Sequence, residues 1–517
     1  MYRVCGYGCY GSAIMKAFDD AIADGVDVLS ISLGSNDPRI DFSTDPIAIG
    51  AFHAMENGIV VACSAGNSGP NPASVENAAP WILTVAATTI DRDFESDVAL
   101  GGNKVIKAGG INFSNLKKSP VYPLIDGLSA KSNSSRADED LARFCDPDSL
   151  DPDKVKGKIL LCERGSMEMF EQLRDQSGAI GMITISDFER QAVSTYKDYP
   201  ISAVTEEDGA QILSYIKSDS KPVATILSTK VIPNYKPAPV VGIFSSKGPI
   251  PGIRNLIKPD IAAPGVNILA AWVEINNEFT IPGKDPSPFV IISGTSMSCP
   301  HVSGLAATIK SQHPTWSPAA IRSAIMTTAI QTDNLYSPIT NFTGLRATPY
   351  DIGAGEISLS SPLEPGLVYE TEKMDYIQFL CSAGYNTTTI KMIASNVPEN
   401  FSCPIDSSFD SISNMNYASI AVSLKENEIK TVSRIVTNVG EDESIYAAIV
   451  EAPSGVDVRV VPDTLQFTKD VKKLEFQVVF EMTEGSQEDL FGSITWFNEK
   501  YKVRSPIAVS NAGQESR

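Results

Sequence analysis

The residues best suited to chemistry lie in one segment, Ser293-Gly294-Thr295-Ser296-Met297-Ser298-Cys299-Pro300-His301-Val302-Ser303-Gly304. A Gly-Thr-Ser turn leads directly into a helical pattern that includes Ala306, Ala307 and Ile309. This places the Ser296 hydroxyl at a helix N-terminus, where unpaired N–H groups and the helix dipole favour negative charge. Serine is also a common helix cap, so the turn alone does not make it a nucleophile.

A second segment, 64–70, reads Ser-Ala-Gly-Asn-Ser-Gly-Pro and follows a predicted strand. Asn67 is a residue type found in turns, and its amide can also donate a hydrogen bond to an oxyanion. The predicted strand 26–34 ends in Ser32, Leu33 and Gly34. An extended peptide can bind beside such a strand through backbone hydrogen bonds, although an ordinary core strand would look the same.

A serine nucleophile needs a base and an acid that orients the base. The chain has three histidines, His53, His301 and His313. His53 lies in a helical pattern, His301 follows Ser296 on the same helix, and His313 precedes a proline where that helix ends. We therefore expect none of the three to be the general base.

The elements around these segments alternate between helix and strand. Apolar spacing predicts helices over 13–22 and 47–57 and strands over 26–34, 59–63 and 82–87. Such alternation predicts a parallel sheet with helices on its faces.

The character of the chain changes near residue 105 to short β-rich runs, and the α/β pattern resumes near Val240. We predict strands over 158–162, 179–184 and 224–227, helices over 172–176 and 206–217, and a further helix from Ser317. From about residue 410 the strands 431–436, 446–450, 457–461, 476–480 and 492–497 predict a β-sandwich.

Composition limits the classes of protein. The 517 residues are 43% hydrophobic and 20% charged, which indicates a globular chain of two to four domains. A net charge of −20 disfavours nucleic acid and anionic membranes as partners. No apolar run is long enough to span a bilayer, and residues 1–6 lack the apolar core of a signal peptide.

Cysteines and glycosylation sequons point to an oxidising compartment. Three cysteine pairs are close in sequence, Cys5 with Cys9, Cys145 with Cys162 and Cys381 with Cys403, whereas Cys63 and Cys299 remain single. None has the spacing of a zinc site, so we expect neither a metal nor a cofactor. The five sequons begin at Asn112, Asn133, Asn341, Asn386 and Asn400.

The segment around Ser296 resembles the nucleophile segment of subtilisin-like serine proteases. Phe244-Ser245-Ser246-Lys247-Gly248-Pro249 and Lys258-Pro259-Asp260-Ile261-Ala262-Ala263-Pro264-Gly265 narrow the resemblance to plant subtilases of the cucumisin-like S8 kind. The resemblance implies that Ser296 is the nucleophile and Asn67 the oxyanion donor. It also implies that substrate binds Ser32, Leu33, Gly34, Ala65 and Gly66.

The resemblance covers nearly the whole chain and divides it. It implies a subtilisin-like α/β domain over 1–104 and 236–408, incomplete at its N-terminus, and a protease-associated β-rich insert over 105–235. A fibronectin-III-like sandwich would occupy 409–517, where Asn416-Tyr417 and Arg434-Ile435-Val436-Thr437-Asn438-Val439-Gly440 match the family. Two residues depart from the family pattern: Glu356 stands where histidine is usual, and Ala418 where proline is usual.

The implied activity is endopeptidase hydrolysis of polypeptides in the extracellular space, the plant apoplast, with possible self-association through the insert. The family's His-Gly-Thr-His segment should precede Tyr2-Arg3-Val4 and has no match here, and its aspartate segment also has none. We therefore expect the chain alone to be inactive. The alternatives are a non-catalytic peptide- or protein-binding relic and a fragment that another chain completes.

Overall fold

A computed structural model describes residues 1–34, 41–134, 137–273 and 285–511. The chain forms two compact units. The main unit comprises Met1–Thr88, Pro239–Gly265 and Gly294–Arg517, and the insert unit comprises Thr89–Ala238 and Val266–Ser293. We describe each unit separately.

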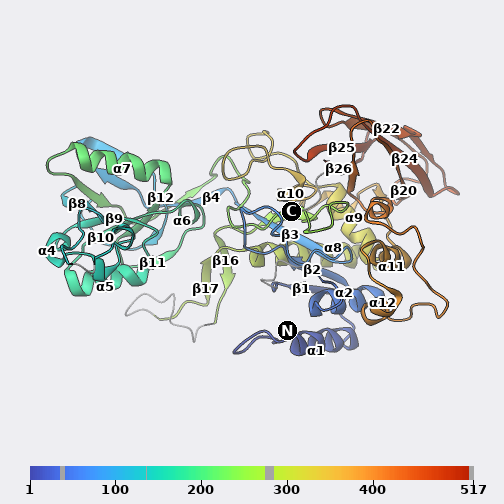
Figure 1. Cartoon of the computed structure of the whole chain (residues 1–517). Helices are drawn as coiled ribbons and strands as arrows, with labels where there is room; N and C mark the ends of the chain where they lie inside the picture. Colours follow the sequence, from blue (N-terminus) through green and yellow to red (C-terminus); the bar gives the residue numbers. More distant parts are fainter. Residues whose placement is uncertain (35–40, 135–136, 274–284, 512–517) are drawn as a thin grey trace. The chain divides into compact units, whose positions relative to one another are not determined.

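A parallel sheet forms the centre of the main unit, in the order β1-β2-β3-β15. Figure 1 labels β1, β2 and β3 of this sheet. Its strands are β1 (Val28–Ile31), β2 (Val60–Ser64), β3 (Leu83–Thr88) and β15 (Ile261–Pro264). β2 and β3 are buried along their whole length, as expected for parallel strands covered on both faces. This sheet confirms the predicted α/β fold class.

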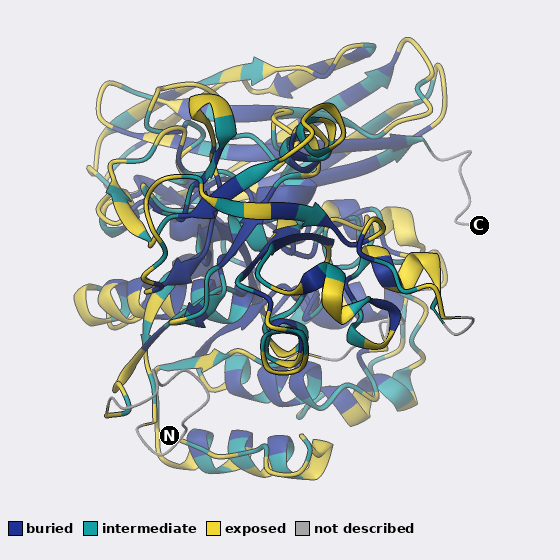
Figure 2. Ribbon diagram, turned by 90° about the vertical axis from the view of Figure 1, so that its left-hand side faces the viewer, coloured by how far each residue is buried: buried dark blue, intermediate teal, exposed yellow. Residues whose placement is uncertain are grey.

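Helices of the main unit pack on this sheet and on one another. The helix α8 contacts all four strands, α2 contacts β2, and α1 packs on α2. Figure 2 shows α1, near the N-terminus, with exposed and buried stripes along its length, as an amphipathic surface helix should have. The helices are α1 (Gly11–Ala23), α2 (Pro46–Glu56), α8 (Thr295–Gln312), α9 (Pro318–Thr327), α10 (Pro349–Ile352), α11 (Lys373–Ser382) and α12 (Thr387–Ile393).

The C-terminal part of the main unit is a β-sandwich, as predicted. One sheet has the order β18-β20-β24-β22 and the other β19-β26-β25-β21-β23. Phe476 and Trp496 meet in the core with ring centroids 4.9 Å apart. The strands are β18 (Leu367–Val368), β19 (Ile420–Leu424), β20 (Ile429–Asn438), β21 (Ser444–Glu451), β22 (Val456–Val461), β23 (Thr464–Phe467), β24 (Lys473–Met482), β25 (Leu490–Phe497) and β26 (Lys502–Asn511).

The insert unit is built on a mixed sheet in the order β12-β10-β9-β8-β13-β5-β6. The predicted helix over 172–176 is part of a longer helix, α5 (Met167–Ser177), which Ser166 caps. The strands are β4 (Arg92–Glu95), β5 (Val98–Leu100), β6 (Lys104–Ile106), β7 (Ile111–Asn112), β8 (Tyr122–Asp126), β9 (Ile159–Glu163), β10 (Gly181–Ile185), β11 (Thr195–Lys197), β12 (Ile201–Val204), β13 (Val223–Ile226), β14 (Lys230–Pro233), β16 (Ile268–Ala271) and β17 (Phe289–Ile292). The other helices are α3 (Glu139–Arg143), α4 (Pro152–Val155), α6 (Asp187–Gln191) and α7 (Glu206–Ser218).

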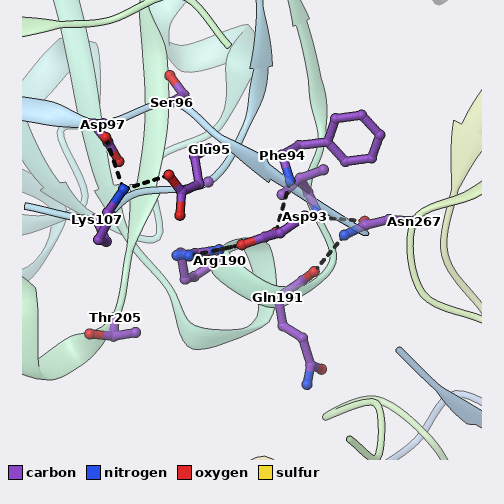
Figure 3. A network of polar contacts seen from close by, with 12 residues as sticks. Asp93, Phe94, Glu95, Ser96, Asp97, Lys107, Arg190, Gln191, Thr205 and Asn267 are labelled. Atoms are coloured by element: carbon purple, nitrogen blue, oxygen red, sulfur yellow. Dashed lines mark hydrogen bonds and ion pairs between the residues drawn. The ribbon is translucent and has the colours of Figure 1, made fainter. Parts of the chain in front are cut away.

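A polar network ties the segment around Asn267 into the insert unit (Figure 3). Asn267 donates from Nδ2 to the Gln191 carbonyl at 2.9 Å and accepts from the Val193 N–H at 3.0 Å. In the adjacent helix α6, the Arg190 guanidinium donates to Asp93 of β4 at 3.1 Å. The two Asn267 contacts attach a segment distant in sequence to this unit.

The three expected disulfides form, joining Cys5 to Cys9, Cys145 to Cys162 and Cys381 to Cys403. Cys63 and Cys299 are buried free thiols, as expected. In the part of the chain that the structure describes, no helix is both long and apolar enough to cross a membrane.

The five sequons differ in their surroundings. Asn112 is fully buried, and its Nδ2 donates to the Ile201 carbonyl, which argues against a glycan there. The side chains of Asn133, Asn386 and Asn400 are exposed, and Asn341 is half-buried. Ser135, the last residue of the sequon that begins at Asn133, lies outside the described residues.

Candidate active site

Ser296 lies in the first turn of α8 and is half-buried. Two backbone hydrogen bonds support the turn before it: Gly294 donates to the Gly265 carbonyl, and Gly265 donates to the Thr88 carbonyl, both at 2.8 Å. A Cβ at Gly265 would lie 2.1 Å from Ser298 Oγ, so this close approach requires glycine. The sheet end at Thr88 thus fixes the start of the serine helix.

Asn67 is oriented by the residue beside the serine. Its Oδ1 accepts from the Thr295 N–H at 2.9 Å and from Thr295 Oγ1 at 3.0 Å. Thr295 Oγ1 in turn accepts from the Gly66 N–H at 3.2 Å. Because a backbone N–H needs an acceptor, the amide oxygen of Asn67 must face Thr295, which leaves its Nδ2 free to donate elsewhere.

The Ser296 carbonyl has a partner outside its helix. Pro300 occupies the position four residues on and has no N–H to donate to this carbonyl. Ser32 Oγ donates to it instead, at 2.8 Å. The end of the predicted substrate strand is therefore attached directly to the nucleophile segment.

Asn77 joins the two predicted substrate-binding segments. Its Nδ2 donates to the carbonyls of Leu33 and Ser64, both at 2.8 Å. One buried amide thus holds the end of the Ser32–Leu33–Gly34 segment beside the start of the Ala65–Gly66 segment. The structure thus places the predicted substrate-binding segments and the Asn67 and Ser296 segments next to one another.

Cys299 lies under the first turn of α8, on the sheet. Its thiol donates to the Ala62 carbonyl at 3.2 Å. Burial raises the pKa of the Cys299 thiol and, more strongly, that of Cys63. Both thiols are therefore protonated and inert at neutral pH, whereas the Ser296 side chain is only half-buried.

Each histidine has a partner other than Ser296. His301 Nδ1 lies 2.8 Å from the Met297 carbonyl, and the five-residue separation puts it about 140° around the helix from Ser296. His53 Nδ1 lies 3.7 Å from Glu56. His313 Nε2 lies 2.9 Å from the Leu363 carbonyl, and its ring stacks on Trp316.

Sequence reasoning did not identify Thr295, Asn77 or Glu76 as part of the site. Thr295 stands inside the recognised segment, but its two partners lie more than two hundred residues away. Asn77 and Glu76 follow Val75 in a stretch without a periodic pattern. Only the fold shows that these residues border the candidate site.

Residues 1–355 match the subtilase family, which is more than half of the chain. The chain belongs to the subtilase family. Residues 414–509 match the fibronectin type-III domain, in agreement with the C-terminal sandwich of this subtilase.

Several plant subtilases are similar along almost the whole chain. A "CO(2)-response secreted protease" from Arabidopsis thaliana is 56% identical over 99% of this chain and 67% of its own length. "Subtilisin-like protease SBT5.1" from the same plant is 49% identical over 99% of this chain and 67% of its own length. "Subtilisin-like serine-protease S" from Lotus japonicus is 42% identical over 99% of this chain and 66% of its own length. The chain thus spans about two thirds of the length of these relatives.

Proposed function

We propose that this subtilase hydrolyses peptide bonds through an acyl-enzyme on Ser296. Ser296 Oγ would attack the substrate carbonyl, and the Asn67 Nδ2 and the Ser296 backbone N–H would hold the oxyanion. The substrate would bind as an extended strand beside Ser32–Leu33–Gly34 and Ala65–Gly66. Water would then release the acyl group.

The observation that carries this proposal is the orientation of Asn67 by Thr295. An oxyanion donor is effective because it is aimed before the charge develops and needs no reorganisation. Two hydrogen bonds hold the amide oxygen of Asn67 and so fix where its nitrogen points. An ordinary turn asparagine would not need such a contact with the residue that precedes the nucleophile.

The proton from Ser296 passes, in the subtilase reaction, to a histidine that an aspartate orients. The resemblance assigns neither role to a residue of this sequence. To test the proposal, the chain is therefore mixed with a polypeptide that carries the aspartate and histidine segments of a plant subtilase. That polypeptide provides the base and the residue that orients it.

A fluorophosphonate probe, which reacts only with activated serines, tests the proposal. We expect labelling in the mixture, mass-spectrometric mapping of the label to Ser296, and no labelling of Ser296→Ala. Unlabelled protein in a mixture that forms a stable complex would overturn the proposal, and so would a label that persists in Ser296→Ala.

The alternative is a peptide-binding protein without catalysis. It is favoured by the histidines, each of which contacts a group other than Ser296. It would be supported by peptides that bind the mixture and are never cleaved or acylated.

Further parts of the proposal rest on the family alone. We propose an extracellular location, glycans at the four sequons outside Asn112, and polypeptides as partners. The 105–235 insert would be a protease-associated domain that also mediates self-association. Secretion of a tagged protein into the medium and mass loss on deglycosylation test the first two points.

A further inference from the structure

The carboxyl group of Glu76 lies between the two segments proposed to bind substrate. A Cβ built at Gly34 would lie 1.8 Å from Glu76 Oε2, and one at Gly66 would lie 2.9 Å from Oε1. The backbone N–H of Glu76 donates to the Ala65 carbonyl at 2.8 Å, which anchors the residue there. The carboxyl therefore fills space that side chains at both glycines would otherwise take.

This carboxyl has no hydrogen bond or ion pair with any described residue, although the side chain is half-buried. The neighbouring loop carries Lys247, but its ammonium pairs with Asp351 at 3.3 Å. On α8, Cys299 is a buried neutral thiol and His301 is bound to the Met297 carbonyl. A partly buried carboxylate without a counter-ion is unfavourable unless a ligand supplies the positive charge.

The position also indicates which part of a substrate would reach it. Gly66 immediately precedes Asn67, the proposed oxyanion donor. The residue whose carbonyl accepts from Asn67 would therefore direct its side chain along Gly66 and Gly34, toward Glu76. That residue is the one on the N-terminal side of the cleaved bond.

We propose that Glu76 selects lysine or arginine at this substrate position. The cation would form a charge-assisted hydrogen bond with the carboxylate, which neutral side chains cannot do. As a statement about cleavage this rests on the proposed function, but as a statement about binding it stands without it. The structure thus assigns a substrate class, cationic peptides, to a site whose specificity the sequence did not indicate.

The protonation of Glu76 adds a distinguishing signature. Partial burial raises the pKa of Glu76 to about 7. The carboxylate form, which attracts a cation, would therefore dominate at pH 8 and be scarce at pH 5.5. The preference for a cationic side chain should follow the same titration.

Equilibrium binding tests this without requiring catalysis. Four fluorescent tetrapeptide amides, identical except for a final arginine, norleucine, glutamine or glutamate, are titrated with the full chain and followed by anisotropy. At pH 8 we expect the arginine peptide to bind about tenfold or more tighter than the norleucine peptide. At pH 5.5 we expect most of this difference to be gone.

Glu76→Gln should abolish both the preference and its pH dependence. Glu426→Gln, an exposed residue of the C-terminal sandwich, changes the net charge equally and should leave both unchanged. A thermal unfolding midpoint equal to that of the parent verifies that Glu76→Gln is folded.

Equal binding of the arginine and norleucine peptides at pH 8 would overturn the proposal. So would a preference that survives Glu76→Gln, or no measurable binding of any of the four peptides. Failure of the proposed function looks different: fluorophosphonate labelling would be absent while the arginine preference and its loss in Glu76→Gln remained.

Discussion

At the scale of single residues, Thr295 positions both sides of the candidate oxyanion site. Its hydroxyl accepts from the Gly66 N–H and donates to Asn67 Oδ1. Thr295→Val keeps the shape but leaves the buried Gly66 N–H unpaired, at a cost of about 1–3 kcal/mol. We expect a lower thermal midpoint. In the mixture with the polypeptide that supplies the aspartate and histidine segments, we expect a lower kcat with little change in KM. Thr295→Ser keeps the hydroxyl and should retain the thermal midpoint and the kcat of the parent. An unchanged kcat in Thr295→Val would contradict the positioning role.

Asn67 itself gives a second prediction at this scale. Removal of the corresponding oxyanion donor in a subtilisin costs about 2.7–4 kcal/mol of transition-state stabilisation. We expect Asn67→Ala to lower the kcat of the same mixture by about a hundredfold or more. Asn67→Ala also leaves the buried Thr295 N–H without its acceptor, so we expect a loss of stability of about 1–3 kcal/mol, comparable to that of Thr295→Val. A normal kcat in Asn67→Ala would show that Asn67 is only a turn residue.

Glu356 predicts a pH dependence of stability. It is buried, it accepts from Thr88 Oγ1 at 2.8 Å, and burial raises its pKa to about 8 from the ordinary 4.5. The stabilisation from the neutral carboxyl is complete below pH 4.5 and is lost as pH rises through 8, because the unfolded chain ionises first. The shift corresponds to about 5 kcal/mol.

Calorimetry from pH 5 to 8 checks this. The thermal midpoint of Glu356→Gln should fall less over this range than that of the parent chain. Glu76 titrates in the same range but is present in both proteins, so the comparison isolates Glu356. Parallel pH profiles for the two proteins would mean that Glu356 is solvated or paired.

At the scale of elements, the missing N–H of Pro300 explains the hydrogen bond between Ser32, which follows β1, and the first turn of α8. Ser32 Oγ takes the Ser296 carbonyl that a helical N–H would otherwise occupy. Ser32→Ala should cost about 0.5–1 kcal/mol, because the site is partly solvated. In a Pro300→Ala background the restored N–H replaces Ser32, so the same change should cost nothing. A double-mutant cycle on thermal midpoints measures this, and additive effects would contradict it.

The sequence predicted elements better than it predicted contacts. Strands such as 59–63 and 82–87 are continuous apolar runs, and buried parallel strands leave that signal. The twelve-residue segment around Ser296 indicated the site because its residues are consecutive in the sequence. Thr295, Asn77 and Glu76 act through partners brought near by folding, for which no spacing rule exists. Asn112 shows the converse: its sequon is a local signal, and burial in the fold overrides it.

At the scale of the molecule, a buried polar network crosses from the parallel sheet of the main unit to the C-terminal sandwich. Lys258 Nζ donates to Asp260 Oδ2 at 2.5 Å, and both side chains are fully buried. Tyr417, just before β19, donates to Asp260 Oδ1 at 2.6 Å, and the Arg322 guanidinium lies 4.4 Å from the Tyr417 ring centroid. Burial lowers the pKa of Lys258 to about 8, so its charge depends on Asp260 being correctly held.

Tyr417→Phe should therefore destabilise the sheet as well as the sandwich. The change removes one hydrogen bond to a buried carboxylate, at a cost of about 1.5–3 kcal/mol. Because Asp260 also accepts from the Thr84 N–H at 2.7 Å, the loss reaches β3, which leads to the candidate site. Hydrogen exchange should show faster opening of β3 together with β19, whereas Tyr336→Phe, the same change at an exposed tyrosine, should alter neither. If only β19 opened faster, the sandwich and the sheet would be energetically independent, and the sandwich would not support the site through this network.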